Sequence, residues 1–455
     1  MRTELSPYAL HFKDSPDMSD SVIIKKQSRI KSPMKVGVQS DHDALNIKSN
    51  FVLLFLIFLI PLQNIYIGKL PSLGGGLNLL NICFLIAFFV WKMRPELNLQ
   101  TQTSLNKPIL LYMGSLLLAL VMHKVSLGVM TMDLVTNVKD MLLAPFLFFI
   151  TLYSVRDRKG IIMAIGATLL PLLYMFRVFY AQHKSVSSWH YDHALRISGT
   201  FSQLGSNEIA TFYAAYTLVL ITLFYFIKTT KVRLVLGFLV ALNLYSLVYS
   251  YSRGAYVGFL IGLIAIVWHT RRKMVFMIIP VFFVFGGVLL NFLPESVQER
   301  FGSITEDESS RDESAQSRFV FWGIAFEQFL QSPIVGKGYL TFIEFNPYHM
   351  DTHNYYMKLL AENGIIGFIV FLVILWRSSK VGRSLYDESD DPLYKALGIG
   401  LFGVVVSLAV GNIFGDRYTH YPLSAYFYVY LAISLRALML VREHNPANNV
   451  ILRRV

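Results

Sequence analysis

Arg196, Arg253 and His353 are the residues of this sequence whose side chains are best suited to chemistry. The guanidinium group of arginine is a planar fork of N–H donors that matches the oxygens of a phosphate. A histidine that is neutral near physiological pH can take a proton from a hydroxyl group. The three residues are far apart in the sequence, so they can act together only if the surrounding elements bring them to one place.

The composition indicates that those elements are membrane spans. Of 455 residues, 54% are hydrophobic and 15% are charged, whereas about 25% of a typical soluble domain is charged. A long water-soluble chain needs a charged surface, so a soluble enzyme and a disordered protein are both excluded. The single cysteine, Cys83, excludes an intramolecular disulfide. We therefore expect an integral membrane protein with many spans.

Twelve apolar stretches approach the length of about 20 residues that a helix needs to cross a bilayer. Closed barrels would instead show alternating hydrophobicity, and this chain has continuous apolar runs. The sequence therefore predicts an all-α bundle of about 12 transmembrane helices. The stretches are 51–67, 77–91, 108–123, 141–155, 160–180, 208–227, 232–250, 254–269, 274–293, 364–376 (with helix expected from 354), 394–413 and 421–441.

The distribution of Lys and Arg predicts the orientation of these spans. Alternate connections, including 156–159, 228–233 and 270–273, carry about twice as many basic residues as the connections on the other side. The positive-inside rule makes the basic side cytoplasmic, with both termini inside. The net charge of +12 is then mostly a feature of topology, and we expect no nucleic-acid partner.

The pattern divides the chain into five parts. Residues 1–50 are polar and lack the design of a secretory signal, so we expect a disordered cytoplasmic tail. Spans one to nine occupy 51–293, and a long outer loop occupies 294–353. Spans ten to twelve occupy 354–441, and 442–455 form a second cytoplasmic tail.

The long outer loop is expected to contain an amphipathic helix. Phe319, Trp322, Phe326 and Phe329 recur at helical spacing and would form one apolar stripe. Two alternatives are open for this helix. It lies on the outer membrane–water boundary, or it packs on the membrane bundle.

Four motifs occur in order along the outer segments, and together they resemble the O-antigen ligase and polymerase superfamily of bacterial envelopes. The resemblance covers roughly residues 190–380. It departs from the family at Gly205-Ser206-Asn207, where many members carry an Asn-Pro-Asn-like triplet, so we do not carry a role over to Asn207. The motifs are Arg196 with Ser198-Gly199-Thr200-Phe201; Ser252-Arg253-Gly254; Arg318 to Trp322 with Pro333 and Gly336-Lys337-Gly338; and His353-Asn354 with Glu362, Gly364 and Gly367.

The resemblance implies a metal-independent glycosyltransferase, without cofactors, on the periplasmic face of the bacterial inner membrane. The donor would be a glycan on undecaprenyl diphosphate. The acceptor would be the next lipid-linked repeat unit, in an exopolysaccharide or O-antigen polymerase, or lipid A–core, in a ligase; we slightly favour the polymerase. Membrane lipids and polysaccharide flippase or chain-length proteins are the partners that this function implies.

The resemblance also implies roles for individual residues. Arg196 and Arg253 would stabilise the charge that develops on the leaving diphosphate, with Arg318 as a third donor to it. His353 would take the proton of the attacking hydroxyl group. We expect Arg196, Arg253 and His353 to converge within about a substrate's width.

Asn354, Ser252 and Arg177 are supporting candidates for the same site. Purely structural roles are the alternatives for three of these arginines. Arg253 and Arg177 could simply extend to the membrane boundary, and Arg318 could anchor the loop helix instead of contacting phosphate.

A metal site and a transporter are the competing hypotheses. Two groups have plausible ligand types, but histidine-rich loops are commonly just solvated, so we predict no metal. Twelve spans with both termini inside also suit a transporter of a small anion or other solute, although such a site should lie near the bilayer midplane. A scaffold without activity is a third interpretation. The two groups are His349, Asp351 and His353, and His190, Asp192 and His193.

Overall fold

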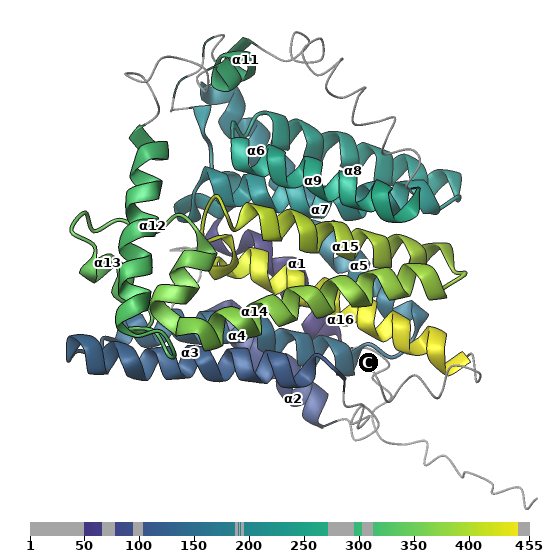
Figure 1. Ribbon diagram of the computed structural model, residues 1–455. Helices are drawn as coiled ribbons and strands as arrows, with labels where there is room; N and C mark the ends of the chain where they lie inside the picture. The colour runs from purple at the N-terminus through teal and green to yellow at the C-terminus, as the bar shows by residue number, and fades with distance from the viewer. Residues whose placement is uncertain are drawn as a thin grey trace, which may run out of the picture. The chain divides into compact units, whose positions relative to one another are not determined.

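The computed structural model describes residues 50–65, 78–93, 103–186, 190, 192, 195–271, 295–302 and 313–444. Its ordered elements are all helical, and these ranges contain no strand (Figure 1). Nine helical segments within them are long and apolar enough to cross a membrane. The prediction of an all-α, multi-pass membrane protein is therefore confirmed.

The described spans are formed by ten helices, because Pro171 divides one span into α5 and α6. A proline removes a backbone donor and interrupts the helical hydrogen-bond ladder. The helices are α3 (Asn106–Leu127), α4 (Met132–Ser154), α5 (Arg158–Leu169), α6 (Pro171–Val186), α7 (Ser206–Phe226), α8 (Thr230–Val248), α9 (Arg253–Thr270), α14 (Tyr355–Glu388), α15 (Pro392–Gly411) and α16 (Tyr421–His444).

The remaining predicted spans are only partly described. Two of them form shorter apolar helices, α1 (Phe51–Leu59), continued by the 3₁₀ turn η1 (Ile60–Ile65), and α2 (Leu79–Lys92). The stretch 274–293 and both predicted tails, apart from residue 50 and the end of α16, lie outside the described residues. The total of twelve spans and the five-part division of the chain therefore stay predictions.

Helix α16 lies at the centre of the bundle and is the most deeply buried of the candidate spans. It packs against α4, α14 and α15 (Figure 1). Tyr216 and Tyr430 occupy this interior, where their hydroxyl groups bond Leu423 O at 2.7 Å and Thr168 Oγ1 at 2.7 Å. Paired hydroxyl groups allow such large polar side chains to be buried without an uncompensated desolvation cost.

Helix α14 bends at Gly364, where φ is +64°. A Cβ atom at this position would lie 2.4 Å from Ile334 O, so only glycine fits. Ile365 N donates to Pro333 O at 2.9 Å, which attaches the outer loop to the bend. The helix continues to Glu388. The helix therefore extends about three turns beyond the apolar stretch 364–376.

The outer loop contains α11 (Glu295–Gly302), α12 (Glu313–Gln331) and α13 (Thr341–Phe345). Figure 1 shows α12 crossing the ends of the membrane helices. We call this end of the bundle the outer end, because the charge distribution predicts that it is periplasmic.

Helix α12 occupies the stretch in which the sequence predicts a loop helix. It packs on the bundle through Phe321 and Ala325, which meet Phe342 and Ala361. The predicted stripe is largely turned outward, with Phe319 71% and Phe326 47% exposed. The inward face follows a different four-residue repeat, which the aromatic residues obscured in the sequence.

Candidate functional site

Arg196 lies in the connection between α6 and the 3₁₀ turn η4 (Gly199–Leu204). Gln182 of α6 fixes this connection by accepting a hydrogen bond from Gly199 N at 2.8 Å. Gly199 has a φ of +51°, and a Cβ atom there would lie 2.6 Å from Ile209 Cδ1. Only glycine fits this turn, and the turn holds Arg196 beside the start of α7.

Asn207 joins the two segments that carry the predicted arginines. Arg196 Nη2 donates to Asn207 Oδ1 at 2.8 Å, and Ser252 Oγ donates to the same oxygen at 2.9 Å. Ser252 precedes Arg253, the first residue of α9. The segments that carry Arg196 and Arg253 therefore meet at the first turn of α7.

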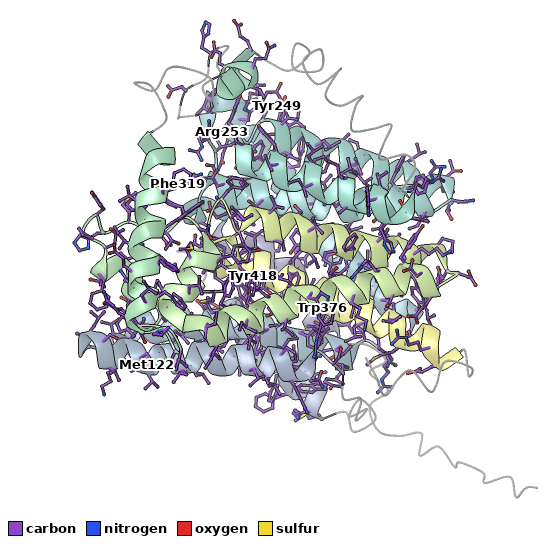
Figure 2. The ribbon with its side chains drawn as sticks, viewed as in Figure 1. Met122, Tyr249, Arg253, Phe319, Trp376 and Tyr418 are labelled. Atoms are coloured by element: carbon purple, nitrogen blue, oxygen red, sulfur yellow. The ribbon has the colours of Figure 1, made fainter. Side chains whose placement is uncertain are left out.

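Arg253 is half-buried at the outer end of the bundle. Figure 2 shows Arg253 and Phe319 at the same end of the membrane helices, with Trp376 farther toward the other end. Arg253 thus lies at the same end of the bundle as α12.

The connection between α15 and α16, residues 412–420, joins the starts of three other helices. A Cβ atom on Gly254 of α9 would lie 2.9 Å from Phe414 Cβ, so the two backbones approach closely. Tyr355 N of α14 donates to Asn412 O at 2.9 Å. We call residues 412–420 the hub loop. The sequence analysis did not identify it.

The third attachment of the hub loop is a buried ion pair between Arg417 and Glu208 in the first turn of α7. His420 Nε2 lies 3.7 Å from Glu208 Oε1 and 3.9 Å from Asp416 Oδ1. Charged groups of the hub loop therefore contact the turn of α7 that also holds Asn207.

Lys358 continues this series of charges into α14. Its Nζ lies 2.9 Å from Asp351 Oδ2 and 3.1 Å from Asp416 Oδ2, and the side chain is buried. Burying one cation is tolerable only when carboxylates compensate it. The pair fixes the segment before α14, which includes His353, to the hub loop. Burial alone would raise the pKa of Asp416, but Lys358 and His420 outweigh burial and hold this pKa well below its usual value.

His353 is held in an unusual backbone conformation. Its φ is +50°, in the left-handed region that residues other than glycine seldom adopt. Trp322 Nε1 of α12 donates to Thr352 O at 3.1 Å on one side. On the other side, Asn354 caps α14 by accepting from Tyr356 N at 2.9 Å. The neighbours on both sides therefore fix the backbone at His353.

The pKa of His353 is lowered from its ordinary value. Burial is the largest cause, and the cations Arg318 and Arg417 lower this pKa further. The carboxylates of Asp351 and Asp416 oppose them only in part. The imidazole is therefore neutral at neutral pH, as a proton acceptor must be.

Of the other predicted cations, Arg318 lies near His353, and Arg177 makes no hydrogen bond or ion pair with the site among the described residues. Arg318 of α12 is half-buried and close enough to His353 to lower the pKa of the imidazole. It is therefore one of the charged groups around His353. Arg177 is exposed on α6 and does not face the buried side of that helix, which carries Met175 and Phe179. The candidacy of Arg177 therefore rests on its position near the outer end of the predicted fifth span.

Two of the helices that start at this site have no side-chain cap at the N-terminus. These helices are α7, which follows Gly205, and α9, which follows Ser252. The hydroxyl group of Ser252 bonds Asn207 instead. The first N–H groups of a helix and its dipole favour an anion. Arg196 bonds Asn207 in the first turn of α7 and Arg253 is the first residue of α9, so these two helix starts suit a multiply charged anion.

Among the described residues, the candidate metal ligands His349, Asp351 and His353 do not come together as a group. Asp351 is already paired with Lys358 and accepts a hydrogen bond from Thr352 N at 2.7 Å. Within the described ranges, one group of three candidate metal ligands comes together, and it is exposed: His190, Glu295 and Glu299. Asp192 is not part of this group, and His193 lies outside the described residues.

Fold and site together define a multi-pass helical membrane protein with a cationic site at the outer end of its bundle. Residues 236–372 match the family described as O-antigen ligase. This segment contains Arg253, Arg318 and His353, and the resemblance inferred from the motifs is thereby confirmed.

Two curated relatives are provisionally named as polysaccharide ligases. A protein of Rickettsia conorii is 24% identical over 177 residues, which are 35% of this chain and 42% of the relative. A protein of Rickettsia felis is 26% identical over 155 residues, which are 30% of this chain and 38% of the relative. The chain thus spans about two fifths of the length of each relative.

Proposed function

We propose that this protein is a membrane glycan transferase that acts at the outer face of the bacterial inner membrane. It transfers a glycan from undecaprenyl diphosphate to a sugar hydroxyl group. The observation that carries the proposal is the shared hydrogen bonding of Arg196 and Ser252 to Asn207. This contact brings two predicted diphosphate-binding segments together at the uncapped starts of two helices.

Arg196, Arg253 and Arg318 hold the diphosphate in this proposal. Arg196 Nε is buried and has no hydrogen-bond partner among the described residues, so a donor of this side chain is available to a ligand. As the bond between the anomeric carbon and the diphosphate oxygen breaks, its electron pair stays on that oxygen. Fixed donors stabilise this charge without a metal ion, and one such donor is typically worth about 3–4 kcal/mol.

His353 is the general base. The acceptor hydroxyl oxygen attacks the anomeric carbon, and its proton moves to the neutral imidazole. The lowered pKa of His353 supports this role, because the imidazole is already unprotonated at neutral pH. Asn354 and Ser252 support the site as a helix cap and as a bridge to Asn207.

The location of the charges favours the transferase over the alternative, a transporter of a small anion. A transporter site is expected near the bilayer midplane, where helices are broken. Here the cations lie at helix starts, and the break in α14 at Gly364 is held by the outer loop. Polymerase remains our preferred subclass, although the relatives are named as ligases. A lipid-linked repeat unit is then the acceptor, and flippase and chain-length proteins are the partners.

The test is complementation of a strain that lacks the gene. Wild type, Arg253→Ala and His353→Ala are compared at matched membrane expression, and surface glycan and lipid A–core are separated on gels. Arg233→Ala and His269→Ala are the matched controls, because both residues lie near the opposite end of the bundle, at the start of α8 and the end of α9.

We expect the two site variants to fail and the two controls to restore glycan. Lipid A–core that carries single repeat units would indicate a lost polymerase, whereas long chains left on the carrier lipid would indicate a lost ligase. Normal glycan in both site variants would reject the proposed roles.

A further inference from the structure

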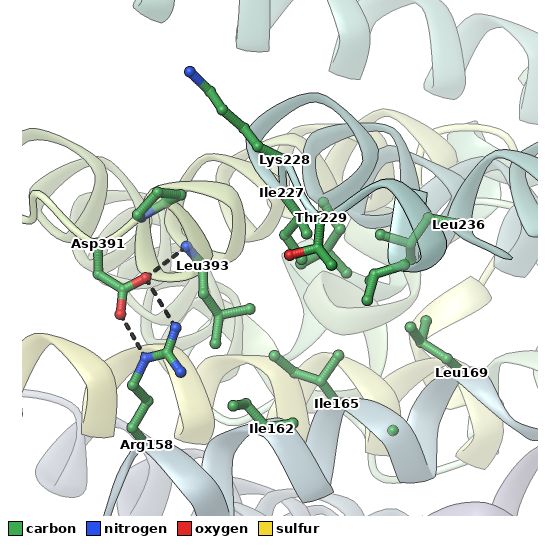
Figure 3. A pocket seen from close by; sticks show the side chains of 14 residues that line it. Arg158, Ile162, Ile165, Leu169, Ile227, Lys228, Thr229, Leu236, Asp391 and Leu393 are labelled. Carbon is green, nitrogen blue, oxygen red and sulfur yellow. Dashed lines mark hydrogen bonds and ion pairs between the residues drawn. The ribbon is translucent and has the colours of Figure 1, made fainter. Parts of the chain in front are cut away.

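A cavity of about 430 Å³ opens at the end of the bundle opposite to the site. It lies between α5, the end of α7, the start of α8 and the start of α15 (Figure 3). Its volume is within the range of small-molecule sites, about 300–1,000 Å³. None of the residues of the proposed active site lines it.

The wall of this cavity is apolar. Ile162, Ile165 and Leu169 of α5 line one side, and Leu236 of α8 lies opposite (Figure 3). Gly166 contributes a gap, because a Cβ atom there would have no neighbour within 4 Å. A wall of this kind accepts a hydrocarbon chain.

The mouth of the cavity is positively charged. Arg158 is neutralised by Asp391, at 2.7 Å, and Asp391 also caps α15 through Leu393 N at 2.8 Å. Lys228, by contrast, is exposed at the mouth and has no ion-pair partner within the described part of the chain. The segment 228–252 contains three basic residues and no acidic residue.

We propose that this cavity binds an anionic phospholipid of the leaflet that the charge distribution predicts to be cytoplasmic. One acyl chain lies between α5 and α8, and the phosphate lies beside Lys228 at the mouth. Lys231 does not line the cavity but is exposed in the first turn of α8, three residues after Lys228. Charge complementarity selects this occupant, because cytoplasmic-leaflet lipids are anionic and basic residues between transmembrane helices bind their headgroups. The proposal does not depend on glycan transfer.

The test measures lipid binding to the purified full-length protein in detergent. Phosphatidylglycerol, phosphatidylcholine and inorganic phosphate are the probes, and retained lipid is counted by native mass spectrometry during titration. Lys228→Gln/Lys231→Gln removes the headgroup charges. Gly166→Leu fills the cavity, and it replaces a glycine inside a helix by a better helix former, so the variant is expected to fold.

Two control variants match these changes elsewhere. Lys380→Gln removes an exposed charge of α14. Gly114→Leu adds the same side chain at another helical glycine with open space around it.

We expect phosphatidylglycerol to bind at least about tenfold more tightly than phosphatidylcholine at low salt, given about tenfold per 1.4 kcal/mol. The lysine double variant should lose the preference for phosphatidylglycerol, and Gly166→Leu should lose lipid binding. Both controls should keep the binding and the preference. Equal binding of the two lipids would overturn the proposal. So would unchanged binding in both site variants, or competition by inorganic phosphate at the same concentration as the lipid.

Discussion

Arg196 and Asn207 share a hydrogen bond of 2.8 Å although a tight 3₁₀ turn separates them in the chain. Ser252 bonds the same oxygen of Asn207 from a different helix. The amide of Asn207 therefore determines the relative placement of the two arginine-bearing segments. Asn207, to which the family resemblance assigned no role, thus connects the two segments of the proposed site.

Asn207→Ala should reduce glycan transfer without removing any proposed catalytic group. The change leaves two donors without their shared acceptor, and an unpaired buried donor costs about 1–3 kcal/mol. We expect a rate loss of about tenfold to a hundredfold, measured with a lipid-diphosphate glycan in membranes. Asn106→Ala, which removes a half-buried asparagine bonded to Tyr153 at 3.3 Å, is the control. Equal activity of the two variants would show that Asn207 does not position Arg196.

Lys358→Met should destabilise the protein and abolish transfer. The substitution leaves Asp351 and Asp416 buried without their common cation, and breaking such a pair typically costs about 3–5 kcal/mol. Thermal unfolding of the purified protein in detergent measures the stability, and the transfer assay measures the activity.

Lys380→Met is the matched control, because it removes an exposed lysine of the same helix. Lys358→Arg keeps the charge and should recover part of the stability. An unfolding midpoint of Lys358→Met equal to that of wild type would show that the ion pairs of Lys358 with Asp351 and Asp416 do not stabilise the fold.

The pH profile of transfer should report His353. Its pKa lies below the ordinary value of about 6.5, so activity should persist through neutral pH and fall only as pH drops below that value. Arg318 lowers this pKa. Removing its charge in Arg318→Gln should therefore raise the pKa and move the acid limb toward higher pH.

The midpoint of that limb is the measurement, because it is independent of any loss in maximal rate. Glu327→Gln removes an exposed charge from the same helix, α12, and should leave the midpoint in place. A pH profile of Arg318→Gln that coincides with that of wild type would show that Arg318 does not influence the pKa of His353.

Gly254→Ala should disturb the contact between α9 and the hub loop. The new Cβ atom would lie 2.9 Å from Phe414 Cβ, and overpacking of this kind costs about 1–3 kcal/mol. Phe414→Gly in the same chain removes that Cβ atom and should restore part of the lost stability and activity. Gly114→Ala, which meets open space, should be neutral. Additive effects of Gly254→Ala and Phe414→Gly would show that the two residues are not coupled.

The membrane architecture could be predicted from the sequence because span length and hydrophobicity carry a strong physical signal. Helix ends were less certain. Helix α4 begins at Met132, nine residues before the predicted stretch, and α14 extends to Glu388. Polar residues continue a helix beyond the apolar run when neighbouring helices support it. The aromatic stripe of α12 was visible from its spacing, but spacing alone does not indicate whether a stripe faces the bundle or turns outward.

The site was predictable only in part. Arginine and histidine types suggested Arg196, Arg253 and His353, and the segments that carry them are linked by contacts. Lys358 and Asp416 gave no distinguishable signal, because charges at the ends of apolar stretches are usually solvated. Their pairing is a long-range contact between α14 and the hub loop, and a single sequence does not encode it in any local pattern.

The hub loop is followed by α16, the most buried of the candidate spans. The ribosome therefore makes the centre of the bundle after the other described spans. Arg196, Arg253, Arg318 and His353 are all synthesised before the hub loop and α16. A nascent chain inserted up to α15 would carry all the proposed reacting groups, but it would lack the loop that assembles them. Under the proposed function, the reacting groups are therefore positioned only after the hub loop and α16 have joined the bundle.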